Sequence, residues 1–489
     1  MAATHGHPLP RSRERDGERV LLALVVAWAT WLRLGLITAG PDPDVDGYAH
    51  FQIARRLAAE WRDLKIHWVW LPLWHLVDLA CDALGGGFVA VRLVSVACAA
   101  ASSFALASLL RRHFEENPAT RPWLAEAERV IPCAAGVVHA LWPQNLSAGS
   151  SAEPEAMFQL LALALMLAWQ RRRWNLAAAS LTAMVLLRYE AWPLLPVMLA
   201  MSAYERRLRE AARVWLAPGV AVALWVALHR WNTGEWMWFL RENRAYVADA
   251  WREFALATRP LPKVAHPWLW YPYTVPFLSA RAWLWIAAPG VPWLVLRAPR
   301  ALVIPSMSLL AVVIVVWVTR RNLGLERHFT VLIPLYATAF AAGVAAPVSA
   351  LAWTLTRRRA ELTRLAVVLA TLWVCFSFGK ARTRKRAMLL RGHAEAAFVS
   401  ERAVARTLRE RARDGSPVFT ETAVIEVLTG FEGRRFFRWK PRDVHDGHLR
   451  REAARHGEAW VEGPPSELTQ LHGAEVVYRD ATRALLRVQ

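Results

Sequence analysis

The sequence has few cysteines, and none of them are clustered. Cys81, Cys98, Cys133 and Cys375 are scattered over 489 residues, with no CxxC pair and no metal-ligand spacing. Charged residues make up 20% of the chain, against about 25% in an average soluble protein. Low-complexity tracts and fixed-period repeats are missing as well. These absences exclude a disulfide framework and a cysteine-based zinc site, and they argue against a soluble enzyme.

Hydrophobic residues are abundant instead, at 55% of the chain with 27 Trp, which excludes intrinsic disorder. They form apolar runs of roughly 17 to 22 residues, the length that crosses a hydrocarbon core about 30 Å thick. We therefore predict an all-α polytopic membrane protein. We expect about eleven spans, at residues 20–39, 88–110, 130–146, 153–170, 174–188, 190–204, 212–230, 279–296, 301–319, 328–350 and 364–379. The first run follows a leader of mixed charge and is interpreted as an uncleaved helix.

Arginines in the short loops predict the orientation, because cytoplasmic loops retain Lys and Arg. With the N-terminus in the cytoplasm, alternate loops carry Arg111–Arg112, Arg171–Arg173, Arg206–Arg213, Arg297–Arg300 and Arg357–Arg364. Two basic groups fall on the wrong side: Arg320, Arg321 and Arg327, and the cluster from Lys380 to Arg386. The prediction is a protein of the cell (cytoplasmic or inner) membrane.

Three regions follow from this pattern. Residues 1–19 form a cytoplasmic tail, residues 20–380 a transmembrane domain with long outer loops at 40–87 and 231–278, and residues 381–489 a soluble tail. The second loop contains an amphipathic stretch suited to the membrane interface. In the soluble tail, a helical pattern near 387–413 precedes strand-like runs at 417–420, 434–438, 458–461, 474–479 and 483–488. This alternation predicts a small α/β domain, and the absence of a GxGxxG or P-loop string assigns it no chemistry.

The first outer loop begins with an acidic turn. Asp42, Asp44 and Asp46 alternate after the first span, where carboxylates can converge on a divalent cation or act as a general base for a hydroxyl. Asp46 stands directly before a helical run, so N-capping is an alternative explanation for it and, to a lesser degree, for Asp44. His50 lies one turn beyond Asp46 and can share its helix face, or serve only as a structural hydrogen-bonding group.

A second acidic motif lies at the same predicted membrane face. Glu153 and Glu155 open the fourth span in GSSAEPEAMF. Acidic residues in a first helical turn complement the helix dipole, so helix initiation alone also explains them. Because both acidic motifs lie at the same predicted membrane face, we expect that together they form a site for a metal or for proton abstraction.

Ionisable residues at the span ends are further candidates, because burial of charge at such depth is costly. Arg33 lies within the last two turns of the first span, although its side chain could also extend to the interface. Arg188 and Glu190 lie in one hairpin and could be a local ion pair, or Arg188 could bind a lipid-linked phosphate. Arg327, His328 and His266 are candidates of the same kind, with a structural role favoured for His266.

The ordered motifs resemble a known superfamily. A span ending in LR, an outer DxD-like turn and the helix YAHFQIARRLA resemble the start of GT-C membrane glycosyltransferases. LLRYEAWPLL, HPWLWYPYTVPFL and ERHFTVLIPLYATAFAAG extend the resemblance in order over about residues 20–350. The tail has no WWD string, which argues against protein N-glycosylation by an oligosaccharyltransferase subunit.

The resemblance implies an inverting transfer of a hexosyl group, of mannosyltransferase type, in the cell envelope. The donor is a polyprenyl-phosphate sugar, and the acceptor is a hydroxyl of a lipid, glycan or protein at the outer membrane face. By motif position, Asp44 or Asp46 is the base, Glu153 and Glu155 are the second acidic motif, and Arg188, Arg327 and Arg33 contact the donor phosphate. Asp44, Asp46 and Glu155 are the expected ligands if Mg²⁺ or Mn²⁺ is used. The partners expected are the donor, the acceptor and membrane lipids, without nucleic acid.

Two other classes fit a protein with many spans. A transporter or lipid flippase is the first alternative, but its sites usually lie near the midplane within repeated broken helices. No internal repeat is visible, and the acidic residues gather at one face. A noncatalytic scaffold is the second alternative. The sequence therefore favours the enzyme.

Overall fold

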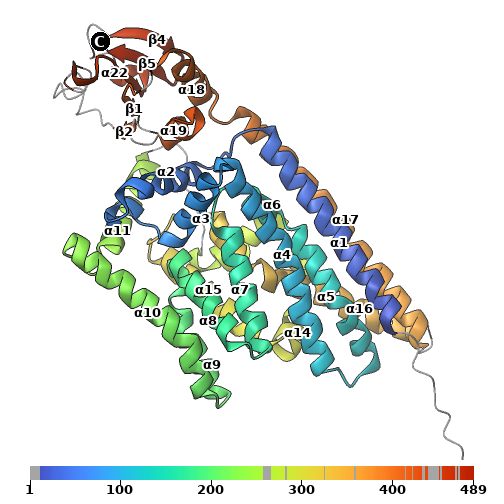
Figure 1. The fold of residues 1–489 in the computed structure, drawn as a ribbon. Coiled ribbons are helices and arrows are strands. Elements are labelled where there is room, and N and C mark those ends of the chain that lie inside the picture. Colours follow the sequence, from blue (N-terminus) through green and yellow to red (C-terminus); the bar gives the residue numbers. More distant parts are fainter. Residues whose placement is uncertain are drawn as a thin grey trace, which may run out of the picture.

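The computed structural model describes residues 11–256, 266–280, 283–323, 325–356, 359–413, 415–420, 422–431, 436–438, 451, 454–468, 471 and 474–488. Over these residues the chain forms a helical bundle with a small domain at one end (Figure 1). The bundle ends in the helix α17, which leads directly into this C-terminal domain (Figure 1).

The helices follow the apolar runs of the sequence. The bundle contains α1 Arg11–Ala39, α4 Gly87–Glu116, α5 Pro122–Ala140, α6 Pro143–Ala148, α7 Glu155–Gln170, α8 Trp174–Leu187, α9 Leu194–Tyr204, α10 Leu208–Thr233, α15 Arg300–Val318, α16 Ile333–Leu355 and α17 Ala360–Ala396. Six helical segments within the described residues are long and apolar enough to cross a membrane: Gly17–Ala39, Gly87–Glu116, Leu208–Thr233, Arg300–Val318, Glu326–Leu355 and Leu362–Ala396. Glu155–Gln170 and Trp174–Leu187 are shorter apolar helices.

The predicted span 279–296 is interrupted. The region contains α12 Val275–Ala280, α13 Trp283–Ala287 and α14 Gly290–Arg297, with a turn between α13 and α14. Pro289 lies in this turn, where its missing N–H and the clash of its ring with the carbonyl four residues earlier break the helix. A Cβ at Gly290 would collide with the backbone of α16 at Ala339, so the glycine lets the two helices approach closely.

The two long loops are folded. The first contains α2 Val45–Glu60, η1 Leu64–His67 and α3 Pro72–Ala83. The second contains α11 Trp238–Leu256, η3 Pro267–Leu269 and η4 Trp270–Thr274. The amphipathic stretch of the sequence lies mainly in α11, whose Tyr246 ring packs on Trp68 of the first loop.

The C-terminal domain is built on a five-stranded sheet of order β2-β1-β3-β5-β4 among the described residues. Its elements are α18 Val399–Arg411, β1 Val418–Thr420, α19 Ala423–Thr429, β2 Phe436–Arg438, β3 Ala459–Gly463, α22 Pro465–Leu468, β4 Glu475–Arg479 and β5 Ala484–Val488. The strand β1 is parallel to β2 and β3, whereas β5 is antiparallel to β3 and β4. All five strand-like runs of the sequence are strands, which confirms the small α/β domain.

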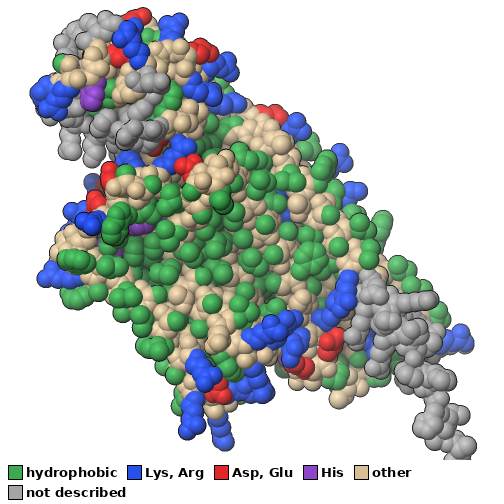
Figure 2. Space-filling model, in the orientation of Figure 1, with side chains coloured by type: hydrophobic (Ala, Val, Ile, Leu, Met, Phe, Trp, Pro, Cys, Tyr) green, Lys and Arg blue, Asp and Glu red, His purple; other side chains and the backbone are tan. Residues whose placement is uncertain are grey.

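The surface of the bundle matches a membrane environment. Hydrophobic side chains cover the middle of the face shown in Figure 2, and Lys and Arg gather at the end opposite the C-terminal domain. The C-terminal domain packs its helix α19 on α2, so the sheet domain and the first loop lie at the same end of the molecule (Figure 1).

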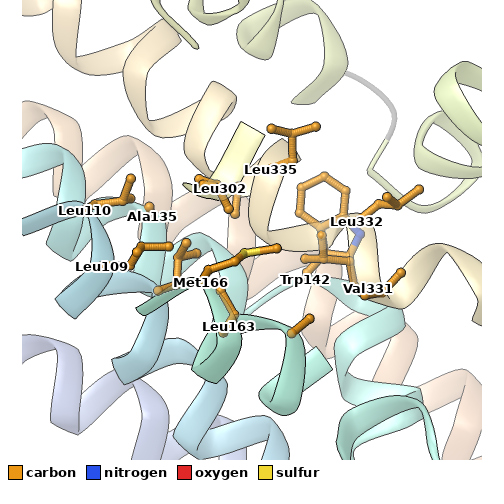
Figure 3. Close-up of a cluster of buried hydrophobic side chains, with 14 of the residues drawn as sticks. Leu109, Leu110, Ala135, Trp142, Leu163, Met166, Leu302, Val331, Leu332 and Leu335 are labelled. Carbon is orange, nitrogen blue, oxygen red and sulfur yellow. The ribbon is translucent and has the colours of Figure 1, made fainter. Parts of the chain in front are cut away.

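A hydrophobic cluster supports the segment that enters α16. This segment is the helical turn η5, Glu326–Leu332. Its Val331 and Leu332 are buried near Trp142 (Figure 3), and the Gln159 amide donates a hydrogen bond of 2.6 Å to the Thr330 carbonyl. Burial of large apolar side chains contributes roughly 1.5 to 3 kcal/mol each. The apolar half of η5 therefore fixes the position of the polar half that precedes it.

Candidate functional site

The acidic turn is organised by its own side chains. The buried Asp42 carboxylate accepts the backbone N–H groups of Asp44 at 3.1 Å and of Ala152 at 2.6 Å. Asp44 then accepts the N–H of Asp46 at 3.1 Å and is the N-cap of α2. The interpretation of Asp46 as the N-cap was therefore wrong, because the helix begins at Val45, one residue earlier. Asp42 joins the first acidic motif to the second by way of Ala152.

Arg327 of η5 lies at the centre of both acidic motifs. Its guanidinium contacts Asp46, lies 2.9 Å from Asp44 Oδ2 and 3.2 Å from Glu153 Oε1, and lies 3.8 Å from Glu155 Oε1. One guanidinium thus touches four carboxylates that come from two distant parts of the sequence. The structure brings together the two acidic motifs that the sequence placed at one membrane face.

A second cation extends this cluster. Arg188 contacts Glu155 and donates hydrogen bonds to both oxygens of Glu190, at 2.9 and 3.3 Å. The Nδ1 atom of His328 lies 2.8 Å from Arg188 Nη2 and 3.1 Å from Glu190 Oε1. Arg188 and Glu190 do form an ion pair, and that pair belongs to the larger cluster.

The cluster forms part of the wall of a cavity of about 500 Å³. Asp44, Asp46, Glu153, Glu155 and Arg327 line the cavity together with a second group of polar residues. This second group comprises Arg92, Gln144, Ser147, Ser150, Ser151 and Arg386. The cavity is large enough for a small polar group such as a sugar, and both acidic and basic side chains face it.

The carboxylates differ in protonation because their surroundings differ. Burial alone raises the pKa of a carboxyl, but the Arg327 charge and its hydrogen bond bring the pKa of Asp46 below the usual value. Burial outweighs Arg327 at Asp44, whose pKa is raised, and at Glu153, whose pKa is raised well above the usual value. Arg327 therefore favours the ionised form of Asp46, whereas burial favours the neutral form of Glu153.

Three of the carboxylates also fit a cation. Oxygen atoms of Asp44, Asp46 and Glu153 lie within 4.8 Å of one another. The third member is Glu153, whereas the sequence suggested Glu155, which contacts Arg188 instead. Carboxylate oxygens suit Mg²⁺ or Mn²⁺, and Oε1 of Glu153 accepts no well-directed hydrogen bond from the described residues. The donor set fits a divalent cation, although Arg327 already supplies positive charge there.

The other predicted residues lie elsewhere. Arg33 is buried and donates to the carbonyls of Ala140 and Asn145, each at 3.3 Å, so it braces α1 against α5 and α6. His266 is exposed beside Trp268. His50 is buried one turn beyond Asp46 and is hydrogen-bonded to His75. These three residues do not line the 500 Å³ cavity described above.

Sequence reasoning missed Arg92 and Arg386 as cavity residues. Arg92 is buried and donates to the carbonyls of Ser150 at 2.8 Å and Gly40 at 3.0 Å. Arg386 donates to Ser147 Oγ at 3.2 Å. Arg386 belongs to the cluster from Lys380 to Arg386, which the predicted topology placed outside the cytoplasm. Basic residues on that side are unexpected, and this exception could have marked Arg386 as a candidate site residue.

The fold resembles solved membrane glycosyltransferases. Two crystal structures of ArnT from Cupriavidus metallidurans match this chain. One, bound to undecaprenyl phosphate, has 14% sequence identity and a TM-score of 0.62 and covers 96% of this chain and 98% of ArnT. The other, in the apo state, has 13% sequence identity and a TM-score of 0.63 and covers 97% of this chain and 98% of ArnT. The oligosaccharyltransferase of Archaeoglobus fulgidus, in a complex with Zn and sulfate, has 12% identity and a TM-score of 0.51 over 90% of this chain and 68% of its own.

These similarities concern the fold. No protein-family model matches the sequence, and no curated protein matches it. The structure neighbours are GT-C proteins, so the chain is an all-α polytopic membrane protein with the GT-C fold and a small C-terminal α/β domain.

Proposed function

We propose that this protein with the GT-C fold is a membrane glycosyltransferase. It transfers a sugar, of hexosyl and mannosyl type, from a polyprenyl-phosphate donor to an acceptor hydroxyl. The observation that supports this most directly is Arg327, which joins both acidic motifs in the wall of the 500 Å³ cavity. The ArnT structure with bound undecaprenyl phosphate supports the choice of donor.

Asp46 is the general base of this proposal. Its pKa is low, it lines the cavity, and it is not the cap of α2. It takes the proton of the acceptor hydroxyl while the acceptor oxygen bonds to the anomeric carbon. The bond from that carbon to the phosphate oxygen breaks, and its electron pair leaves with the lipid phosphate. Attack from the face opposite the phosphate inverts the anomeric centre.

Arg327 and Arg188 stabilise the charge that develops on the leaving phosphate. Guanidinium groups bind phosphate oxygens in a bidentate manner, and such preorganised charge accounts for a large share of catalysis. The raised pKa of the buried Glu153 lowers the negative charge that the phosphate would meet. A Mg²⁺ or Mn²⁺ ion, if bound by Asp44, Asp46 and Glu153, would supply further positive charge at the same place.

The cavity is lined by the start of α2, on which α19 of the C-terminal domain packs, and by Leu390 and Ala394 near the end of α17. It therefore lies towards the end of the bundle that carries the C-terminal domain, whereas Lys and Arg gather at the opposite end (Figure 2). Positive charge on the cytoplasmic side would place this cavity at the outer face of the cell membrane, with the N-terminus in the cytoplasm. The acceptor is then a lipid, glycan or protein of the cell envelope.

The test is sugar release from a panel of polyprenyl-phosphate sugars by the purified protein in lipid. We expect turnover with one donor and its loss in Asp46→Asn, with the folded state retained in thermal unfolding. Absence of turnover with every donor, together with counter-flow of a solute in sealed vesicles, would overturn the proposal in favour of a transporter.

A further inference from the structure

Three buried histidines form a continuous hydrogen-bonded chain beside the cavity. Nδ1 of His50 lies 2.9 Å from Nε2 of His75, and Nδ1 of His75 lies 2.7 Å from Nδ1 of His67. The three rings come from α2, α3 and η1, and each is at most 3% exposed. Three imidazoles joined in this way are not needed to fold a helical loop, since apolar side chains would fill the same space without polar atoms to satisfy.

The chain begins next to the general base. Asp46 and His50 are four residues apart on α2, so their side chains share a helix face. The two groups are electrostatically coupled, because Asp46 raises the pKa of His50 and His50 lowers the pKa of Asp46. A water molecule between the two side chains would carry a proton from Asp46 to the ring of His50.

The other end of the chain lies near the surface. His67 is the last residue of η1, and the exposed Asp63 is the N-cap of that turn. The Asp63 carboxylate raises the pKa of His67, whereas burial and the neighbouring His229 lower it. The chain thus runs from His50, one helical turn beyond the cavity-lining Asp46, towards the exposed Asp63.

The rings are shielded and neutral. The ring of Trp70 lies 4.3 Å from that of His50, and Trp225 lies 5.5 Å from His67. Burial lowers the pKa of His50 to about 3 and of His67 to about 4, and it lowers the pKa of His75 as well. Arg327 and Arg188 add to this effect at His50. Neutral imidazoles have one donor and one acceptor nitrogen, as a relay requires.

We infer that His50, His75 and His67 form a proton exit from Asp46 to the surface beside Asp63. This inference rests on the proposed glycosyl transfer. One proton enters at the free nitrogen of His50, each N–H bond shifts to the next ring, and one proton leaves from His67 to Asp63 or water. The three rings are neutral before and after, and they reorient between turnovers. His75 and His67 are positioning residues, because they act through His50.

The test uses substitutions that keep the hydrogen bond but cannot carry a proton. In His67→Asn the side-chain amide replaces Nδ1 and keeps the contact with His75. We expect kcat to fall by about tenfold with KM for the donor unchanged, less than the loss of about 100-fold or more expected for the base itself. Imidazole in the buffer should restore kcat in His67→Ala, where the substitution leaves space for it.

His139→Asn is the matched control. His139 is buried and forms a hydrogen bond of 2.9 Å through Nδ1 to Ser103, but it lies outside the chain. We expect wild-type kcat for this variant. Unchanged kcat in His67→Asn, or a loss in His67→Ala that imidazole does not restore, would overturn the relay while wild-type turnover still supports the glycosyltransferase. A wild-type protein without turnover would overturn both.

Discussion

Buried carboxylates occur in two parts of this protein, and they are stabilised in opposite ways. In the C-terminal domain, Glu458 accepts hydrogen bonds from Ser416 at 2.6 Å, from Arg487 at 2.8 and 3.0 Å, and from Trp460 at 3.3 Å. At the cavity, four carboxylates share the guanidinium of Arg327. One region has several donors for one acid, and the other has several acids for one cation.

The difference separates a structural role from a functional one. Ample donors hold Glu458 in one charged state, and they bring its pKa to about 2 in spite of burial. At the cavity, Oε2 of Glu155 accepts no hydrogen bond from the described residues. Buried polar groups without partners are costly, and they mark places where a ligand or proton completes the structure.

The largest expected effect is that of Asp46→Asn. The change removes the proposed base but keeps the shape of the side chain, so we expect kcat for sugar transfer to fall at least about 100-fold. Binding of polyprenyl phosphate should stay within about threefold of wild type, because the base does not contact the lipid phosphate. Initial rates and lipid-phosphate titration measure the two effects. A variant with wild-type kcat would remove Asp46 from the mechanism and leave Asp44 as the candidate.

Arg327→Gln removes the cation that the four cavity carboxylates share, and it should therefore alter the cavity while the surroundings of Glu458 stay unchanged. Removing one partner of a buried ion pair lowers the free energy of unfolding by about 3 to 5 kcal/mol. The loss is smaller here because the Arg327 side chain is partly exposed. Arg327 lowers the pKa of Asp46, so its loss raises that pKa and moves the acid limb of the kcat/KM profile to higher pH. The pH dependence of kcat/KM measures this shift. An acid limb that stays in place would show that another group controls it.

Glu458→Gln is the corresponding change in the C-terminal domain. It should lower the free energy of unfolding by about 1 to 3 kcal/mol at pH 7 and leave kcat unchanged. Its folded pKa is about 2, against 4.5 when unperturbed, so its stabilisation is present above pH 4.5 and is lost as the pH falls towards 2. Denaturant unfolding at pH 7 and pH 3 should therefore show a smaller difference between variant and wild type at pH 3. Equal differences would contradict this account.

The smallest effect concerns divalent cations. Arg327 already places a guanidinium against Asp44, Asp46 and Glu153, so Mn²⁺ should raise the unfolding temperature of the wild type by no more than about 1 °C at 1 mM. In Arg327→Gln the same ion should stabilise the protein by several degrees, by binding only the folded state. Thermal unfolding with and without EDTA compares the two. A large shift in the wild type would show that the cation binds beside Arg327 rather than in its place.

Much of the fold could be predicted because it depends on local patterns. Long apolar runs require helices in a membrane, since no other segment satisfies its own backbone there. The strand runs of the C-terminal domain could be predicted in the same way, because β1 consists of β-branched and aromatic residues, and β3 and β5 each contain a short run of large or β-branched apolar residues. The break at Pro289 was missed because hydropathy alone does not register the missing N–H of proline.

The site could be predicted only as separate halves. The acidic motifs around Asp44 and Glu153 were visible as charges at one predicted membrane face, and Arg327 was visible as a cation on the wrong side of the charge rule. The histidine chain was not visible, because His50 and His75 are 25 residues apart and lie on different helices. Nothing in the spacing of these residues indicates that their rings are in contact.

The sequence by itself determined the class of protein: hydrophobicity requires a membrane, and the acidic motifs and arginines were candidate site residues at one predicted membrane face. Only the tertiary structure decided how the groups combine. Arg327 is 281 residues from Asp46, and the contact between them depends on the packing of η5 against α6 and α7. Sequence periodicity records which face of a helix is apolar, whereas the pairing of charges depends on which helices pack together.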